Sequence, residues 1–176
     1  AELAPATDRA RRRVAAERLT IDWCAARRVR CVVLRVPGIY GPGRLPLERL
    51  QRGEPVLRPE DAGPGNRIHV DDLVAACVAA IECGASGAFN VTDGDYTSTS
   101  EYFLMTARLA GLPEPPLVAR TEAHARISPG MLSYLNETRR VDNTRMREVL
   151  RVPLKYPQVR DGIAASLAEM RANPEG

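Results

Sequence analysis

Side chains able to transfer protons gather in the segment RIHVDD, residues 67–72. His69 could act as a general acid or base because an imidazole titrates near neutral pH, and Asp71 and Asp72 could complete an acid–base set with it. The same residues also suit a structural role, in which His69 packs or satisfies backbone groups and the aspartates cap a helix. We favour the structural interpretation of this segment.

Four arginines fill five positions near the start of the chain, in the stretch RARRR at residues 9–13. Such a cluster could bind nucleic acid, form a solvated helix end, or belong to a chemical site. The 25 basic residues of the chain face 22 acidic ones, which leaves a formal net charge of +3. This excess is small and spread along the sequence, whereas nucleic-acid-binding domains concentrate it on one face. We therefore expect no nucleic-acid partner.

The cysteines do not form a metal-binding pattern, because none of them stands in a C-x-x-C pair. They are Cys24, Cys31, Cys77 and Cys83. With only two histidines beside them, the sequence predicts no metal site and instead small buried thiols in a reducing compartment, by default the cytoplasm. No run of about 18 apolar residues is present, so no membrane span is expected. The arginine-rich first 13 residues do not resemble a signal peptide.

Short apolar strands alternate with helical patterns along the 176 residues, which predicts one α/β domain with a smaller accessory lobe. The expected strands are 30–36, 55–58, 66–70, 87–94 and 139–141. The expected helices are 8–28, 46–52, 72–83, 99–110, 121–136 with a break near Pro129, 144–150 and 157–172. The proline- and glycine-rich stretch PGIYGPGRLP, residues 37–46, is predicted to be a loop that turns sharply and closely approaches another group.

Side-chain patterns define several helix ends and faces. In the first helix, three- and four-residue steps place apolar residues on one face. They are Ala16, Leu19, Trp23 and Ala26. Thr7 or Asp8 is the expected N-cap of that helix, Asp71 or Asp72 that of helix 72–83, Thr97 or Ser98 that of helix 99–110, and Asn143 that of helix 144–150.

Four segments in a fixed order resemble the C-terminal half of the extended short-chain dehydrogenase/reductase family, the NAD-dependent epimerase/dehydratase group. They are LRVPGIYGPGR at 34–44, RIHVDDLVAA at 67–76, FNVTDG at 89–94 and RVDNTRMREVL at 140–150. The resemblance covers nearly the whole chain and includes uncharacterised nucleoside-diphosphate-sugar-epimerase-like members. It implies an α/β fold made of the C-terminal part of a Rossmann-like parallel sheet plus a small mixed α/β substrate lobe.

The resemblance also implies that two parts of the chain have different roles. Residues 1–95 would supply late strands and helices of the Rossmann-like domain with a substrate loop. Residues 96–176 would form a mostly helical substrate-binding lobe, interleaved with 37–65. The family's glycine-rich turn, which holds the pyrophosphate of NAD or NADP, is missing from the sequence. We therefore expect the chain to begin mid-protein and to pair with a complementary N-terminal half or with itself.

The family places a Y-x-x-x-K pair on the first helix, followed four residues later by a glutamate. Counted back from Glu17, the lysine position is Arg13 and the tyrosine position is Arg9. A guanidinium stays protonated at any working pH, so Arg9 cannot replace the phenol as general acid and base. The resemblance implies that Arg13 contacts the cofactor and Arg9 the substrate, and it leaves no catalytic residue assigned.

The loop after the first strand carries the remaining implied contacts. By resemblance, Pro37, Gly38 and Ile39 would lie against the nicotinamide, while Tyr40 and Arg44 would face the substrate. Proline and glycine could also be present only to make a turn at this point.

One further arginine has an implied role. Nucleotide-sugar enzymes of the family place an arginine where this sequence has Gly65, and Arg67 stands two residues later. We assign Arg67 to substrate binding, and the shift weakens the expectation of a nucleoside-diphosphate sugar.

Two functions remain open. The first is part of an NAD(P)-dependent oxidoreductase or epimerase acting on a small carbonyl or sugar-like substrate, inactive as this chain alone. The second is a non-catalytic family member that senses or binds a dinucleotide or metabolite, since the Tyr/Lys pair is replaced by arginines.

Overall fold

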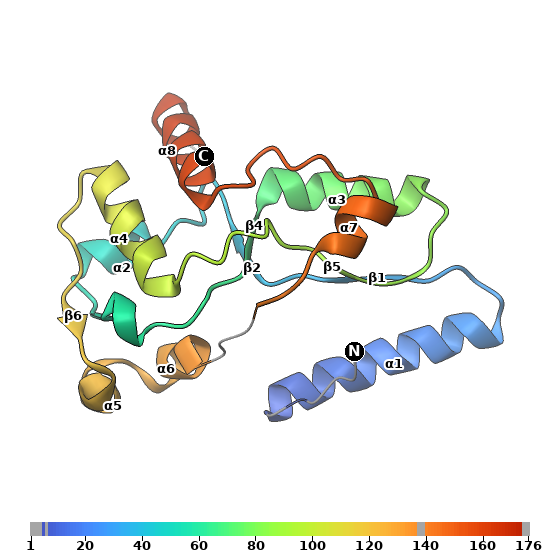
Figure 1. The fold of residues 1–176 in the computed structure, drawn as a ribbon, viewed down its shortest axis with the longest axis horizontal. Coiled ribbons are helices and arrows are strands. Elements are labelled where there is room, and N and C mark those ends of the chain that lie inside the picture. Colours follow the sequence, from blue (N-terminus) through green and yellow to red (C-terminus); the bar gives the residue numbers. More distant parts are fainter. Residues whose placement is uncertain (1–4, 6, 137–139, 174–176) are drawn as a thin grey trace.

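The computed structural model describes residues 5, 7–136 and 140–173. Its helices are α1 (Asp8–Ala26), α2 (Leu47–Gln51), α3 (Val70–Glu82), α4 (Thr99–Ala110), α5 (Ala123–Arg126), α6 (Pro129–Asn136), α7 (Thr144–Val149) and α8 (Val159–Ala172). Its strands are β1 (Val32–Arg35), β2 (Gly38–Tyr40), β3 (Val56–Leu57), β4 (Arg67–His69), β5 (Gly87–Asn90) and β6 (Leu117–Val118). Figure 1 shows helices around short strands, the α/β class that the sequence predicts.

The strands form three parallel pairs, β1 with β5, β2 with β4, and β3 with β6. Parallel strands need long crossovers, and helices supply several of them here. The pair β2–β4 corrects the expectation that residues 37–46 are only a loop, because Gly38–Tyr40 pairs with Arg67–His69. Gly41 follows with φ +151°, and a Cβ there would approach Val70 Cγ1 at 2.7 Å. That position accepts only glycine.

Buried side chains form three clusters. One lies in the lobe around α2, α4 and α8, and one lies under β3 and β6 against α5 and α6. The third packs β1, β4 and β5 against α3 and α7. Helix α1 lies apart from these clusters in Figure 1, and Cys24 is its one buried residue among those described. The predicted apolar face of α1 does not reach the core, since Leu19 is 72% exposed and Trp23 51%.

Helix caps follow the sequence pattern in α1 and α4 but not in α3. Thr7 accepts from the Ala10 amide, and Ser98 forms a capping box with Glu101. In α3 the cap is His69, whose side chain accepts from the Asp71 backbone N–H, so the expected Asp71 or Asp72 cap is wrong. Asn143 precedes α7 as expected, but its side chain makes no capping bond.

The remaining expectations have mixed outcomes. All four cysteines are free, yet only Cys24 is buried, and Cys77 and Cys83 are exposed. The predicted strand 139–141 starts outside the described residues, and its described part, residues 140–141, is not in a strand. Among the residues described, no helix combines the length and apolar character that crossing a bilayer requires.

Candidate functional site

A cavity of about 520 Å³ opens between the first turns of α1 and the body of the molecule. Helix α1 contributes Arg9 and Arg13, and residues 36–39, which run from the end of β1 into β2, form a second side. Residues 62–66, which precede β4, form a third. The lining is completed by Thr99, Gly130, Leu135 and Val141. This volume falls in the range of small-molecule sites.

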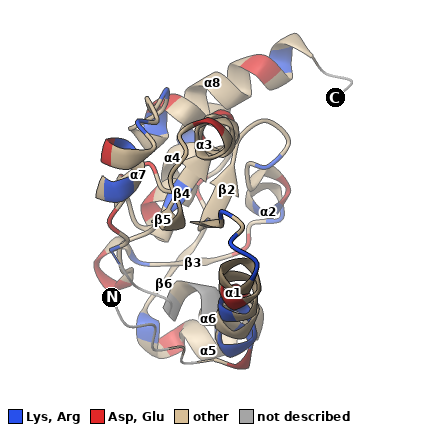
Figure 2. Cartoon of the chain, turned by 90° about the vertical axis from the view of Figure 1, so that its right-hand side faces the viewer, with Lys and Arg blue, Asp and Glu red and all other residues tan. Residues whose placement is uncertain are grey.

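The two arginines lie four positions apart on α1, so they are neighbours on one face of the helix. Both are exposed, and neither has an ion-pair partner among the described residues. Arg11, which lies between them in sequence, is instead bonded to Asp8. No described lining residue is acidic, so the two guanidinium groups set the charge of the described lining. Figure 2 shows the basic residues of α1 beside α6.

Five of the predicted site residues thus line one cavity, namely Arg9, Arg13, Pro37, Gly38 and Ile39. The chain leaves β1 at Arg35, which pairs with Glu17 of α1 at the start of this segment. The Arg35–Glu17 pair therefore fixes the distance between α1 and the 36–39 segment. Ion pairs of this partly buried, bidentate kind give more geometric specificity than exposed ones.

Tyr40 lies elsewhere. It is 2% exposed and packs edge-on against His69 and Tyr102. A Cβ at Gly162 of α8 would collide with its hydroxyl, which makes no hydrogen bond within the described structure. Burial and the nearby Asp93 raise the pKa of this phenol well above its usual value. Successive residues of a strand point to opposite faces, so Ile39 lines the cavity while Tyr40 enters the core.

The other two predicted substrate contacts also lie outside the cavity. Arg44 is exposed on the turn after β2. Arg67 is buried, donates to the Thr97 carbonyl at 2.7 Å and to Thr99 Oγ1 at 3.3 Å, and stacks on Tyr102. Its guanidinium therefore positions the start of α4, including Thr99, which does line the cavity.

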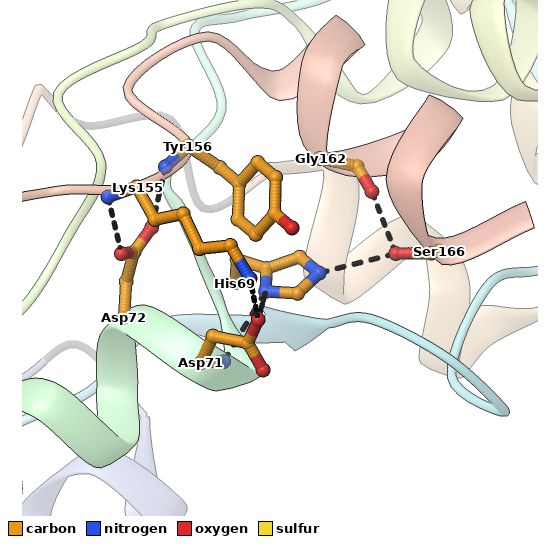
Figure 3. A network of polar contacts seen from close by, with 7 residues as sticks. All are labelled: His69, Asp71, Asp72, Lys155, Tyr156, Gly162 and Ser166. Atoms are coloured by element: carbon orange, nitrogen blue, oxygen red, sulfur yellow. Dashed lines mark hydrogen bonds and ion pairs between the residues drawn. The ribbon is translucent and has the colours of Figure 1, made fainter. Parts of the chain in front are cut away.

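His69 is the centre of a buried polar network that joins β4, α3 and α8 (Figure 3). Its Nδ1 accepts from the Asp71 backbone N–H at 3.2 Å, and its Nε2 lies 3.1 Å from Ser166 Oγ. The Ser166 hydroxyl donates to the Gly162 carbonyl, so Nε2 carries the proton and the imidazole is neutral. Burial lowers the pKa of His69, in keeping with that state. The structural interpretation of His69 is confirmed.

The two aspartates of this network have different tasks (Figure 3). Asp72 is 1% exposed, and its carboxylate accepts from the backbone N–H groups of Lys155 and Tyr156, at 2.7 and 3.0 Å. Asp71 is partly exposed and pairs with the Lys155 ammonium at 2.9 Å. Both hold the segment that leads into α8 against α3. None of these groups lines the cavity, so they position the lobe and do not reach a ligand there.

Residues 62–66 were not predicted to line a site, and neither were Thr99, Leu135 and Val141. The first of these segments, AGPGN, carries a signal of its own, because its glycines and proline stand directly before β4. The others come from the lobe and depend on tertiary packing. Within the described part of the chain, no group of three His, Cys, Asp or Glu side chains could hold a metal ion.

Comparison with known proteins gives sequence relatives and similar folds. No family model matches the sequence. The 3-diazoavenalumate denitrifying reductase of a Streptomyces species is 32% identical over 138 residues, which cover 75% of this chain and 45% of the reductase. A functionally unknown conserved protein from Silicibacter pomeroyi DSS is 35% identical with a TM-score of 0.80, covering 95% of this chain and 57% of that one.

A third comparison identifies the fold. The dTDP-glucose 4,6-dehydratase of Bacillus anthracis str. Ames, in complex with NAD, superposes with a TM-score of 0.73 at 16% identity. The chain has the extended short-chain dehydrogenase/reductase fold. The match covers 99% of this chain and 55% of the dehydratase, so the chain spans about half the length of its relatives.

Proposed function

We propose that this chain forms the nicotinamide- and substrate-facing part of an NAD(P)-dependent oxidoreductase or epimerase. The observation that carries the proposal is the single cavity shared by Arg9, Arg13 and residues 37–39, the positions that the family resemblance assigns to cofactor and substrate. The dehydratase of the same fold is a complex with NAD. The donor set suits the nicotinamide end of such a cofactor, whereas a glycine-rich phosphate turn is absent from the sequence.

The residues of the chain have distinct roles in this proposal. When bound, the nicotinamide supplies or accepts a hydride. Arg13 donates to ribose hydroxyls, and residues 37–39 provide a wall that excludes water from one side of the ring. Arg9 faces the substrate. A complementary dinucleotide-binding half, or a second copy of the chain, completes the site, and the four free thiols suit a reducing compartment such as the cytoplasm.

A second function is favoured by one specific observation. The polar side chains among the described lining residues belong to Arg, Asn and Thr, none of which takes up or releases a proton near neutral pH. Acid–base catalysis would therefore need a group from outside the described lining. A non-catalytic member that binds a dinucleotide or metabolite without turning it over has no such need.

The cofactor proposal is tested with a chimera. The part of the Silicibacter pomeroyi protein that this chain does not cover is joined to this chain, and folding is checked by circular dichroism. We expect NADH or NADPH to raise the melting temperature of the chimera, since a ligand that binds only the folded state stabilises it. Arg13→Gln should weaken this effect, and Arg12→Gln, on the same helix but outside the cavity, should not.

Two outcomes separate the candidates. Turnover of NAD(P)H with a panel of small carbonyl compounds supports the oxidoreductase, and binding without turnover supports the sensor. A folded chimera that binds neither cofactor contradicts the oxidoreductase and the dinucleotide-binding alternative.

Self-association is the expected behaviour of the isolated chain. Within the described structure β1 pairs only with β5, so its other edge lacks a neighbour. Apolar side chains are exposed on both α1 and α3, including Leu19, Trp23 and Ile81. Unpaired edges and apolar patches promote association. Light scattering should give a mass above the 19.3 kDa of one chain, and a Leu19→Gln/Trp23→Gln variant should shift it toward the monomer.

Arg18→Gln, an exposed change on the same helix, is the control and should leave the measured mass unchanged. A wild-type chain that stays monomeric over a tenfold range of concentration would contradict this proposal.

A further inference from the structure

The described lining of the cavity carries an unbalanced positive charge. Arg9 and Arg13 stand one helical turn apart, and like charges at this spacing repel each other. Neither is paired within the described structure, and the described lining contains no carboxylate. By contrast, the partly buried Arg35 and Arg49 are paired with Glu17 and Glu54. An anion bound between Arg9 and Arg13 would remove the repulsion and satisfy both groups.

The side-chain type narrows the ligand. A guanidinium is planar, always charged, and donates two parallel hydrogen bonds to a carboxylate or a phosphate. A lysine at either position would offer only a point charge. Two adjacent guanidinium groups on one helix face therefore suit an oxyanion that accepts hydrogen bonds from both.

Part of the cavity suits an apolar group. Its described walls include Val36, Ile39, Leu135 and Val141, and its two prolines, Pro37 and Pro64, carry no backbone N–H. Phosphate sites usually add several backbone N–H groups from a glycine turn or helix end. The described lining of this cavity does include Gly63, Gly65 and Gly130, together with Asn66 and Thr99, so part of it is polar. The two guanidinium groups and the apolar walls are the features that suit an acid with an apolar body.

We propose that Arg9 and Arg13 together bind the carboxylate of a small organic acid whose remaining body is apolar. The inference rests on the proposed function, because it takes the cavity as the substrate site. It assigns a substrate class to the two arginines that replace the family's tyrosine and lysine. Arg9 and Arg13 act here as binding residues, and the acid's body lies against the apolar walls. Because a guanidinium has five N–H donors, Arg13 can bind the acid and a ribose hydroxyl at the same time.

The test measures binding directly and without cofactor. The protein is titrated by calorimetry with 3-phenylpropanoate, with its neutral amide 3-phenylpropanamide, and with 2-phenylethyl phosphate. We expect the carboxylate to bind at least about tenfold more tightly than the amide, because a charge-assisted hydrogen bond contributes more than a neutral one. Arg9→Gln and Arg13→Gln should each weaken carboxylate binding by about tenfold and leave amide binding unchanged.

Arg12→Gln is the matched control, since Arg12 is exposed on the same helix and does not line the cavity. It should leave all affinities unchanged. The inference is overturned if acid and amide bind equally, if the acid does not bind, or if neither cavity variant alters acid binding. It is also overturned if the phosphate ester binds tenfold more tightly than the acid.

The cofactor enters as a separate arm. If Arg9→Gln and Arg13→Gln weaken NAD⁺ binding to the chimera but not acid binding, the arginines bind the cofactor's phosphates and the inference fails. If the chimera binds neither cofactor while the acid and amide differ as expected, the proposed function fails and the carboxylate site stands.

Discussion

Replacing Asp72 with alanine is expected to lower the free energy of unfolding by about 3 kcal/mol or more. The Asp72 carboxylate is buried and accepts from the backbone N–H groups of Lys155 and Tyr156. Alanine would leave both N–H groups, which lie in part-buried hydrogen bonds, without their shared acceptor and would remove a buried carboxylate that joins the two segments. The segment before α8 would detach from α3, so the effect should be cooperative across the lobe. Urea denaturation monitored by circular dichroism measures it.

Asp71→Ala is the matched control for this prediction. Asp71 is partly exposed, and its pair with the Lys155 ammonium is solvent-screened, so its loss should cost less than about 1 kcal/mol. The backbone N–H of residue 71 donates to His69 Nδ1, and the alanine variant retains this hydrogen bond. Hydrogen exchange at the Lys155 and Tyr156 amides should accelerate in Asp72→Ala and not in Asp71→Ala. Equal losses of stability in the two variants would contradict the assigned roles.

The sequence predicts most helices and strands of this fold but neither β2 nor the two-residue β6. Residues 37–46 contain enough proline and glycine to indicate a loop, and the three-residue pairing of Gly38–Tyr40 with β4 arises only from tertiary contact. Missing that strand also misplaced Tyr40. In a loop its side chain could face the substrate, whereas strand alternation sends it to the core.

In helix α1 the sequence predicted the cavity residues but not what would cover the apolar face. Its family position could be predicted from Glu17, and the structure brings Arg9 and Arg13 to the same cavity as residues 37–39. Its apolar face could not be assigned a partner from periodicity, because periodicity shows that a face exists and not what covers it. In this chain Leu19 and Trp23 remain exposed.

The N-cap of α3 is a third feature that the sequence did not predict correctly. Aspartate is a strong N-cap, so Asp71 and Asp72 were the natural candidates for α3. The helix begins earlier, at Val70, and the His69 ring takes the capping position. The freed Asp72 carboxylate then bonds residues more than 80 positions away. Long-range pairings of this kind leave no local pattern in a sequence.

Asp93 carries the second large effect, and it depends on pH. Its side chain is 4% exposed, Oδ1 accepts from the Asp95 backbone N–H, and Oδ2 has no hydrogen-bond partner within the described structure. Burial, with help from the nearby Asp95 and Asp72 carboxylates and despite Arg67, raises the pKa of Asp93 to about 7. The folded state therefore holds a proton that the unfolded state has released above its ordinary pKa of 3.8.

The sign of the effect follows from this difference. Between pH 4 and pH 7 the folded state binds more protons at Asp93, so its contribution to stability falls as pH rises through this window. One pKa unit corresponds to about 1.4 kcal/mol, so a shift of about three units costs up to about 4 kcal/mol above pH 7. His69, with a lowered pKa, acts in the opposite sense and loses stability as pH falls below its ordinary value of 6.5.

Asp93→Asn should remove the Asp93 cost, because the amide keeps the Oδ1 acceptor and carries no charge. We expect the variant to be more stable than the wild type by about 2–4 kcal/mol at pH 8 and nearly equal to it at pH 4. Urea denaturation at each pH gives the difference, in which the His69 contribution cancels. Asp22→Asn, an exposed change on α1, should show no such pH dependence. A difference between Asp93→Asn and the wild type that is constant across this range would show that Asp93 ionises normally in the folded protein.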